Sequence, residues 1–184
     1  FNGEAMIDAM NNFSRPRPSH SYVNNYTSNT LFYYEVKVQI ERSKPLIEIG
    51  FRNGNYTVWH YFYFCPSGGY ISCFDNKHKK DKFINLSSSF SFNNEDIIGC
   101  GVVYPPSHLD FNYPYIFFTQ NGEQIGKSLL MNETFEYLLP YVVLKYCSIE
   151  TNFGEDLLFK PFKYDITNHI VSDEYYKEEE FSDE

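Results

Sequence analysis

Hydrophobic and polar residues alternate along several short stretches of the chain. The clearest stretch is residues 32–41 (FYYEVKVQIE), in which Tyr34, Val36, Val38 and Ile40 fall on one face and charged or amide side chains fall on the other. A period of two residues is typical of a β-strand that is buried on one side only. We therefore expect a strand here, with its apolar face in a core.

Further strand-like runs follow, with turn signals between them. The predicted strands are residues 46–51, 57–64, 68–74, 82–86, 96–104, 138–145, 148–153 and 157–164, together with a hairpin over 116–126. Short strands at regular spacing, without a long amphipathic helix, predict an all-β protein built as a two-layer antiparallel β-sandwich. Residues 5–13 (AMIDAMNNF) can form a short helix that the prolines after it would end, so this prediction includes a short helical or irregular segment at the N-terminus.

Two glycines share one face of the predicted strand 96–104 (DIIGCGVVY). Ile98, Cys100 and Val102 lie on its other face, which we expect to be buried. Paired glycines in a strand usually mark the close approach of a bulky group. Gly99 and Gly101 therefore predict aromatic side chains packed closely against this strand.

The hairpin prediction depends on Asn121-Gly122 in residues 116–126 (IFFTQNGEQIG). This dipeptide readily adopts the positive φ angles that a two-residue hairpin turn requires. Phe117 and Phe118 must point to opposite faces of their strand, so at least one of them should enter the core.

Composition supports a β-rich fold and limits the partners. Aromatic residues make up 20% of the 184 residues, and such side chains favour strands over helices. The net charge is −9, but residues 173–184 carry seven acidic residues and one lysine, so the body is close to neutral. Duplex nucleic acid is therefore not an expected partner. The basic run 76–82 (NKHKKDK) is interpreted as a solvated loop, and an acidic partner is its alternative.

Cysteine and histidine spacing gives no sign of a metal site or a catalytic centre. The four cysteines form no C-x-x-C pair, the five histidines are scattered, and no G-x-S-x-G motif is present. We predict a protein that is not an enzyme and that has no cofactor, no metal and no membrane partner. Cys100 lies in an apolar run, which favours a reduced thiol and an intracellular protein, cytoplasmic or nuclear. The chain begins at Phe1, and we expect it to be part of a larger multidomain chain.

The order of motifs resembles a SPRY domain. The motifs are YYEVKV, IEIGF, GGY, DIIGCGV, IFFTQNGEQIG, LLPYVVL and ETNFG, and the resemblance runs over residues 32–164. Among SPRY domains the chain most resembles the type found in Ran-binding protein M and in ubiquitin-ligase-associated proteins. The strands agree better than the loops: residues 56–76, apart from Gly69-Tyr70, and residues 104–114 depart from the family pattern. The resemblance implies a SPRY-like sandwich with concanavalin-like architecture that acts as a protein-interaction module.

The resemblance also implies where a partner would bind, since relatives meet peptides through loops at one edge of the sandwich. The predicted contact residues are Arg52, Asn53, Asn55, Tyr56, Trp59, Tyr70, Lys145, Tyr146 and Cys147. Tyrosine, tryptophan and arginine are frequent interface anchors. Trp59 could equally be a core residue, and for Tyr70 the core is the favoured interpretation.

These observations give one leading function and one alternative. The leading function is a non-catalytic module that recognises a partner protein or short peptide, as the recognition part of a ubiquitin-ligase or signalling assembly. The alternative is a carbohydrate-binding, lectin-like sandwich, since lectins share this architecture. We predict that residues 31–168 form the sandwich. Residues 1–30 form an extension that packs on it or leads into it, and the acidic tail 169–184 is disordered.

Overall fold

The structure is a computed structural model that describes residues 4–9, 13–14, 29–54, 59–75, 80–105, 113–131, 135, 137–177 and 180–183. One short 3₁₀-helix, η1, covers Ile166–Asn168. The strands are β1 (Ala5–Asp8), β2 (Phe13–Ser14), β3 (Thr30–Ile40), β4 (Leu46–Gly54), β5 (Trp59–Cys65), β6 (Tyr70–Asp75), β7 (Lys80–Asn85), β8 (Ile97–Tyr104), β9 (Tyr115–Gln120), β10 (Glu123–Leu130), β11 (Tyr137–Lys145), β12 (Cys147–Asn152) and β13 (Ser182–Asp183).

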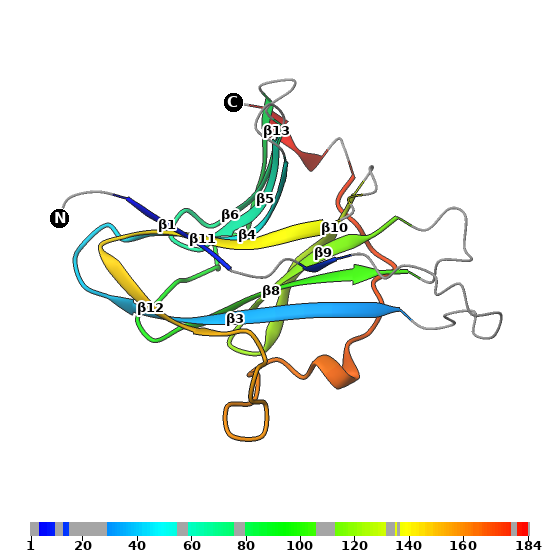
Figure 1. Ribbon diagram of the computed structural model, residues 1–184. Helices are drawn as coiled ribbons and strands as arrows, with labels where there is room; N and C mark the ends of the chain where they lie inside the picture. The colour runs from blue at the N-terminus through cyan, green and yellow to red at the C-terminus, as the bar shows by residue number, and fades with distance from the viewer. Residues whose placement is uncertain are drawn as a thin grey trace.

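Two antiparallel sheets face each other as a sandwich (Figure 1). The larger sheet has the order β1-β11-β4-β5-β6-β7-β13, with β2 also paired to β11, and the smaller has the order β10-β9-β8-β3-β12. In Figure 1 the strands β5 and β6 rise steeply from the level of β11, so the larger sheet is strongly bent. The predicted all-β antiparallel sandwich is confirmed.

The core between the sheets contains the residues that alternation assigned to it. Tyr34, Val36 and Val38 of β3 are fully buried, as are Ile98, Cys100 and Val102 of β8. The Tyr34 hydroxyl crosses to the other sheet and donates to the carbonyl oxygens of Gly50, at 2.6 Å, and Tyr141, at 3.0 Å. A buried polar group that bonds to both partners adds specificity to the packing of one sheet on the other.

The β9–β10 hairpin has the predicted turn. Asn121 and Gly122 have φ angles of 53° and 91°. The buried carboxylate of Asp96, just before β8, accepts hydrogen bonds from the side chains of Gln120, at 2.7 Å, and Asn121, at 2.8 Å. Asp96 therefore ties the hairpin to the segment that enters β8.

The paired glycines of β8 lie under aromatic side chains, as predicted. A Cβ atom at Gly99 would lie 2.0 Å from the Tyr33 hydroxyl, and one at Gly101 would lie 2.3 Å from the Phe117 ring. Phe118 enters the core between the sheets, whereas Phe117 packs with Tyr33 on the outer face of the smaller sheet. That outer face is therefore a second apolar layer and not a solvated surface.

The C-terminal segment covers this outer face. Phe162 packs edge-on against Tyr33 at 4.9 Å, and the His169 ring stacks on Phe117 at 4.3 Å. Farther along, Tyr175 bridges to Ser128 of β10, and β13 pairs with β7 of the larger sheet. In Figure 1 this segment runs from the smaller sheet around the edge of the sandwich to the larger sheet.

Three local expectations differ from the structure. The helical alternative for residues 5–13 is wrong: Ala5–Asp8 and Phe13–Ser14 form strands that pair with β11, because that strand offers a free edge for hydrogen bonding. The strand predicted over 157–164 is absent, since residues 155–159 form a turn instead. The tail 169–184 was expected to be disordered, but its described residues pack on the sandwich through tyrosine and histidine side chains.

Candidate functional site

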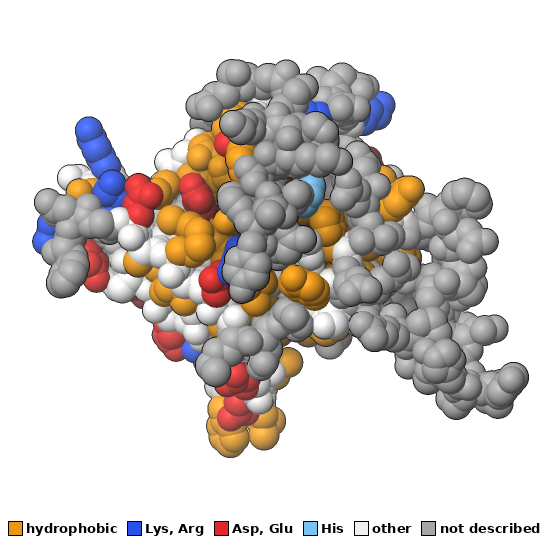
Figure 2. Space-filling model, turned by 45° about the horizontal axis from the view of Figure 1, so that its top comes forward, with side chains coloured by type: hydrophobic (Ala, Val, Ile, Leu, Met, Phe, Trp, Pro, Cys, Tyr) orange, Lys and Arg blue, Asp and Glu red, His pale blue; other side chains and the backbone are white. Residues whose placement is uncertain are grey.

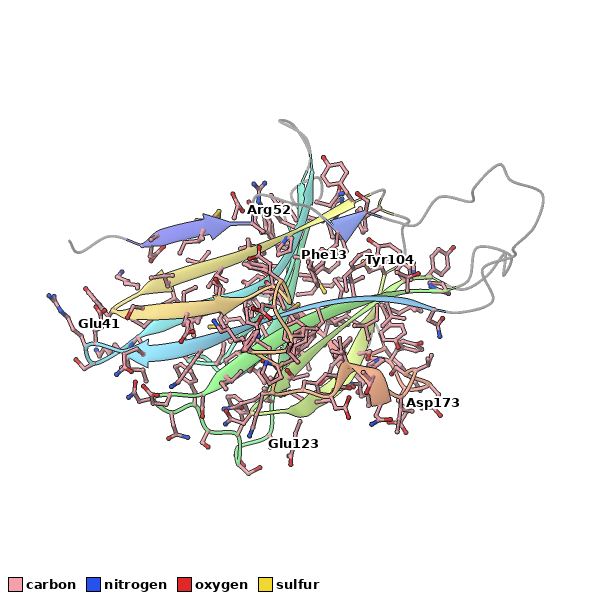
Figure 3. The ribbon with its side chains drawn as sticks, turned by 60° about the horizontal axis from the view of Figure 1, so that its bottom comes forward. Phe13, Glu41, Arg52, Tyr104, Glu123 and Asp173 are labelled. Atoms are coloured by element: carbon pink, nitrogen blue, oxygen red, sulfur yellow. The ribbon has the colours of Figure 1, made fainter. Side chains whose placement is uncertain are left out.

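Strand register separates the predicted contact residues into two groups. In the β4–β11 pair, Leu46 lies opposite Lys145 and Arg52 lies opposite Leu139. Six residues of a strand span about 20 Å. In Figure 3 the labelled Glu41, whose N–H donates to the carbonyl of Tyr146, lies far along the strands from the labelled Arg52. The expected convergence of the two groups into one pocket is therefore wrong.

The Arg52 group is engaged within the domain. The Arg52 guanidinium makes two hydrogen bonds to the Asp8 carboxylate of β1, at 2.8 and 2.9 Å. The Asn53 amide donates to the carbonyl oxygen of Tyr137. These bonds hold β1 and β4 against the start of β11. Asn55, Tyr56 and the Trp59 side chain lie outside the described part of the chain; the backbone of Trp59 opens β5.

Tyr146 forms the corner between β11 and β12. Its backbone is left-handed, with a φ of 59°, which is uncommon for a residue other than glycine. Its carbonyl accepts hydrogen bonds from the N–H groups of Glu41, at 3.0 Å, and Arg42, at 3.2 Å. The half-buried ring lies 5.9 Å from the Arg42 guanidinium carbon and 5.6 Å from the Lys145 Nζ atom. The corner therefore combines an aromatic ring with two cations.

Cys147 and Tyr70 are the other predicted contacts on the Tyr146 side. Cys147 is only 5% exposed, and its thiol donates to the Leu46 carbonyl at 3.3 Å. It is a packing residue in this structure and is not placed to contact a partner. Tyr70 is half-buried and lies edge-on to Phe83 at 5.2 Å and to Tyr63 at 6.2 Å. Tyr70 therefore packs in an aromatic cluster on the outer face of the larger sheet and not in the core between the sheets.

The outer face of the larger sheet carries several tyrosines, of which the sequence analysis singled out Tyr70 alone. We call Glu48, Tyr61, Tyr63, Tyr70 and Tyr141 the tyrosine face. Tyr61 lies edge-on to Tyr141 at 5.3 Å, and Tyr141 is only 2% exposed. Figure 2, which brings the upper side of Figure 1 forward, shows hydrophobic and acidic side chains mixed on one face. The face is thus both aromatic and acidic.

Glu48 is the carboxylate in the middle of the tyrosine face. Burial, together with the negative charges of Glu4 and Asp81, raises the pKa of Glu48 to about 7. The burial of Tyr141 and the charge of Glu48 together raise the pKa of the Tyr141 hydroxyl well above its usual range. A carboxylate without a compensating charge is costly in such surroundings.

Two further surface features lie elsewhere on the sandwich. An open groove of about 960 Å³ runs between residues 84–93 and the β9–β10 hairpin, lined mainly by amide and hydroxyl side chains. The turn after β12 projects from the body and exposes Leu158 by 86% and Phe159 by 83% (Figures 1 and 2). Asn152 holds this turn by donating to the Lys160 carbonyl at 2.9 Å and accepting from the Gly154 N–H at 3.0 Å.

Metal and membrane features were searched over the described residues. Within these residues, no three histidine, cysteine, aspartate or glutamate side chains come together in a way that could hold a metal ion. The same part of the chain contains no helix with the length and apolar character needed to span a membrane. The four cysteines are free thiols, and Cys65, Cys100 and Cys147 are buried.

Known proteins similar to the chain fall into two groups. A curated relative, the probable ATP-dependent RNA helicase ddx1 of Dictyostelium discoideum, is 31% identical over 148 residues, which is 77% of this chain and 16% of the relative. The chain thus spans about one sixth of that protein. Solved structures with a similar fold include a human SPRY domain, with a TM-score of 0.48, 19% identity, and coverage of 84% of this chain and 99% of that one. Sheep galectin-11 in complex with glycerol has a TM-score of 0.41, 14% identity, and coverage of 72% and 100%. The carbohydrate-binding module CBM66 of Bacillus subtilis has a TM-score of 0.42, 9% identity, and coverage of 82% and 83%.

A family model supplies the assignment. The model described as SPRY domain matches residues 31–156, well over half of the chain. That range runs from β3 through β12 and into the turn that follows β12, and it contains most of both sheets. The resemblance to the Ran-binding protein M type stays a prediction. The chain belongs to the SPRY domain family.

Proposed function

We propose that this domain binds a partner protein through the corner formed by Tyr146, Arg42 and Lys145. SPRY domains are generally protein-interaction modules, and their fold is non-catalytic. The observation that carries the proposal is Tyr146 itself, a tyrosine held in a left-handed conformation with its ring between two cations. Strained non-glycine residues cluster at functional sites, and tyrosine and arginine are common interface anchors.

The charges at this corner suggest the chemistry of the partner. Arg42 is exposed. The Lys145 Nζ atom also pairs with the Glu4 carboxylate, at 3.5 Å. An extended peptide with an acidic residue next to an apolar or aromatic one would match a ring flanked by cations. The acidic chain as a whole disfavours nucleic acid as the partner of this corner.

A curated relative in sequence suggests the setting in which the domain works. That relative is a probable ATP-dependent RNA helicase, and the chain matches 16% of its length. We propose that the domain is a module of a longer multidomain protein and that it recruits a protein partner for the rest of that protein. A ubiquitin-ligase or signalling assembly, and an intracellular location, remain proposals that the same experiment would test through the partners it identifies.

A matched pair of tyrosine variants tests the corner. Tyr137 begins the same strand, β11, at the other end and is 38% exposed. Asparagine tolerates the left-handed conformation, so Tyr146→Asn removes the ring at little cost to the backbone. Proteins captured from a cell lysate should include a set that is lost with Tyr146→Asn and kept with Tyr137→Asn. Thermal melting should be unchanged in both variants. Partners that survive Tyr146→Asn but are lost with Tyr137→Asn would contradict the proposal.

Carbohydrate binding is the second candidate, and the groove beside the hairpin favours it. Its lining includes Asn85, Ser87, Ser91 and Gln124 as polar side chains, with Phe90 and Tyr176 as aromatic ones. Amides, hydroxyls and aromatic rings are the groups that bind sugars. A glycan array is the direct test. Saturable binding that Gln124→Ala weakens would support the lectin function. An array without binding would contradict it, and protein binding would then be the remaining candidate.

A further inference from the structure

The tyrosine face surrounds a position on the sheet that has no side chain. Gly50 of β4 lies opposite Tyr141 on one side and opposite Tyr63 on the other. A Cβ atom at Gly50 would lie 1.9 Å from the carbonyl oxygen of Phe62, so glycine is required there. Glu48, two residues before Gly50, shares its face of the strand. Two tyrosine rings and one carboxylate thus border the space over Gly50.

Charged groups on this face are paired, with one exception among the described residues. Arg52 pairs with Asp8 at 2.8 Å, and Lys145 pairs with Glu4 at 3.5 Å. The Asp81 carboxylate accepts a hydrogen bond from Ser72 at 2.6 Å. Glu48 is half-buried, and within the described chain no cation or hydrogen-bond donor faces it.

A second polar group on the same face is also without a partner. The Tyr141 hydroxyl is buried and makes no hydrogen bond within the described chain, although Tyr141 is only 2% exposed. An unsatisfied buried hydroxyl costs about 1–3 kcal/mol, and native proteins contain few of them. The charge of Glu48 acts on this hydroxyl, so the two groups are neighbours. A carboxylate without a donor and a hydroxyl without a partner therefore meet within a ring of aromatic side chains.

We propose that the tyrosine face is a binding site for the arginine side chain of a partner peptide, with Glu48 as its counter-ion. A guanidinium group has five N–H donors, of which two match a carboxylate in a bidentate pair. Its planar faces stack on aromatic rings, a contact worth about 0.5–2 kcal/mol. This site is separate from the Tyr146 corner and does not depend on the function proposed there.

Arginine fits this face better than lysine. A guanidinium carries less tightly bound water than an ammonium group, so its transfer to an aromatic, half-buried site costs less. The net charge of the face also favours a cation, because its described residues include four carboxylates, those of Glu4, Asp8, Glu48 and Asp81, and two cations, Arg52 and Lys145. A peptide is the source because backbone contacts along the strands would add to one anchoring side chain.

Three short peptides and two variants test the proposal. The probes are acetyl-Gly-Arg-Gly-amide, its lysine analogue and its citrulline analogue, which keeps the shape of arginine without the charge. Binding is followed by chemical shifts in two-dimensional NMR spectra of the domain at pH 8. Glu48→Gln removes the counter-ion at constant shape. Glu123→Gln, an exposed carboxylate of β10, is the control.

We expect saturable binding of the arginine peptide, with the shifts grouped on β4, β5 and β11. Glu48→Gln should weaken that binding about tenfold, which corresponds to about 1.4 kcal/mol, and Glu123→Gln should leave it unchanged. The lysine peptide should bind more weakly and the citrulline peptide should not bind. Equal binding of arginine and citrulline, or equal binding by wild type and Glu48→Gln, would overturn the proposal. Tyr146→Asn should bind the arginine peptide normally, so failure of one site does not imply failure of the other.

Discussion

Two glutamates on the outer faces of the two sheets have opposite surroundings. Glu35 of β3 is 4% exposed, and its carboxylate accepts hydrogen bonds from the Tyr33 hydroxyl and from the backbone N–H groups of Lys163 and Tyr164, all between 2.8 and 2.9 Å. Glu48 of β4 is half-buried, and within the described chain no donor faces it. Both glutamates lie at outward-facing positions of strands in which apolar and polar residues alternate.

The difference follows from what covers each sheet. The C-terminal segment lies over the smaller sheet and brings its own backbone donors to Glu35. For Glu48, the described groups that act on its charge are the carboxylates of Glu4 and Asp81. A buried carboxylate that accepts hydrogen bonds from its own chain helps to hold the fold together. A half-buried carboxylate without such donors can instead contribute binding free energy to a ligand that supplies them.

The largest expected effect is on stability. Glu35→Gln removes the charge and turns one acceptor into a donor that faces backbone N–H groups. We expect a loss of about 3 kcal/mol in the free energy of unfolding, since each buried donor left unpaired costs about 1–3 kcal/mol. Glu48→Gln should instead raise it by on the order of 1 kcal/mol at pH 8, because it removes a half-buried charge that the described residues leave without a partner. Urea unfolding of both variants measures the contrast. Equal losses in the free energy of unfolding would show that the two carboxylates contribute alike to stability and would contradict the comparison.

A glycine variant tests the apolar part of the covered face. In Gly101→Ala, the added methyl group would lie 2.3 Å from the Phe117 ring, which stacks on His169 at 4.3 Å. Overpacking of this kind costs about 1–3 kcal/mol. It should also loosen the C-terminal segment, so limited proteolysis after residue 160 should become faster. Ser148→Ala on the exposed side of β12 is the control. A variant as stable and as resistant as wild type would mean that the segment does not depend on this packing.

The pH dependence of stability separates the two faces by sign. The pKa of Glu48 rises from 4.5 to about 7 in the folded protein, so the folded state holds a proton that the unfolded chain has released. The stability of wild type relative to Glu48→Gln should therefore fall as pH rises from 4.5 to 7, by on the order of 1 kcal/mol. The groups facing Glu48 from neighbouring strands are Glu4, Asp81 and the tyrosines Tyr63, Tyr70 and Tyr141.

His169 on the covered face should act in the opposite direction. Burial lowers the pKa of His169, whose ring nitrogens bond to the hydroxyls of Tyr115, at 3.0 Å, and Tyr164, at 2.7 Å. The folded state therefore favours the neutral ring, and stability should be lost as pH falls below 6.5. Urea unfolding of wild type, Glu48→Gln and His169→Phe between pH 4.5 and 8 resolves both contributions. A wild-type curve parallel to both variants would contradict the two assignments.

Alternation along single strands was enough to predict the core between the sheets. It placed Tyr34, Val36 and Ile98 correctly, and the glycine pair in β8 correctly predicted a crowded face. It also assigned Glu35 to solvent, because a period of two cannot show that a third layer covers the outer face. Residues 160–177 form that layer. They carry three acidic residues and three lysines without regular alternation, so the sequence gives no sign that their aromatic side chains pack on a sheet.

The candidate sites were harder to predict, because they depend on register between strands far apart in sequence. Arg52 and Tyr146 appeared to share one edge, but β4 and β11 run antiparallel, so their loops lie at opposite ends. The tyrosine face has a weak sequence signal, a glycine in IEIGF across from alternate tyrosines in HYFYF. Only the pairing of β11, β4 and β5 shows that Tyr141, Gly50 and Tyr63 lie in one row.

The last contrast concerns two phenylalanines three residues apart. Phe162 packs edge-on against Tyr33 at 4.9 Å under the covered face, whereas Phe159 is 83% exposed at the projecting turn. Phe162→Ala should destabilise the fold by about 2 kcal/mol, since it removes an aromatic contact and part of the cover over Glu35. Phe159→Ala should change stability by less than about 0.5 kcal/mol, because its ring already lies in water. Thermal melting of the two variants side by side gives the answer. If Phe159→Ala proved as costly as Phe162→Ala, the turn would have to fold back onto the sandwich, and the boundary between the covered and uncovered faces would move beyond residue 159.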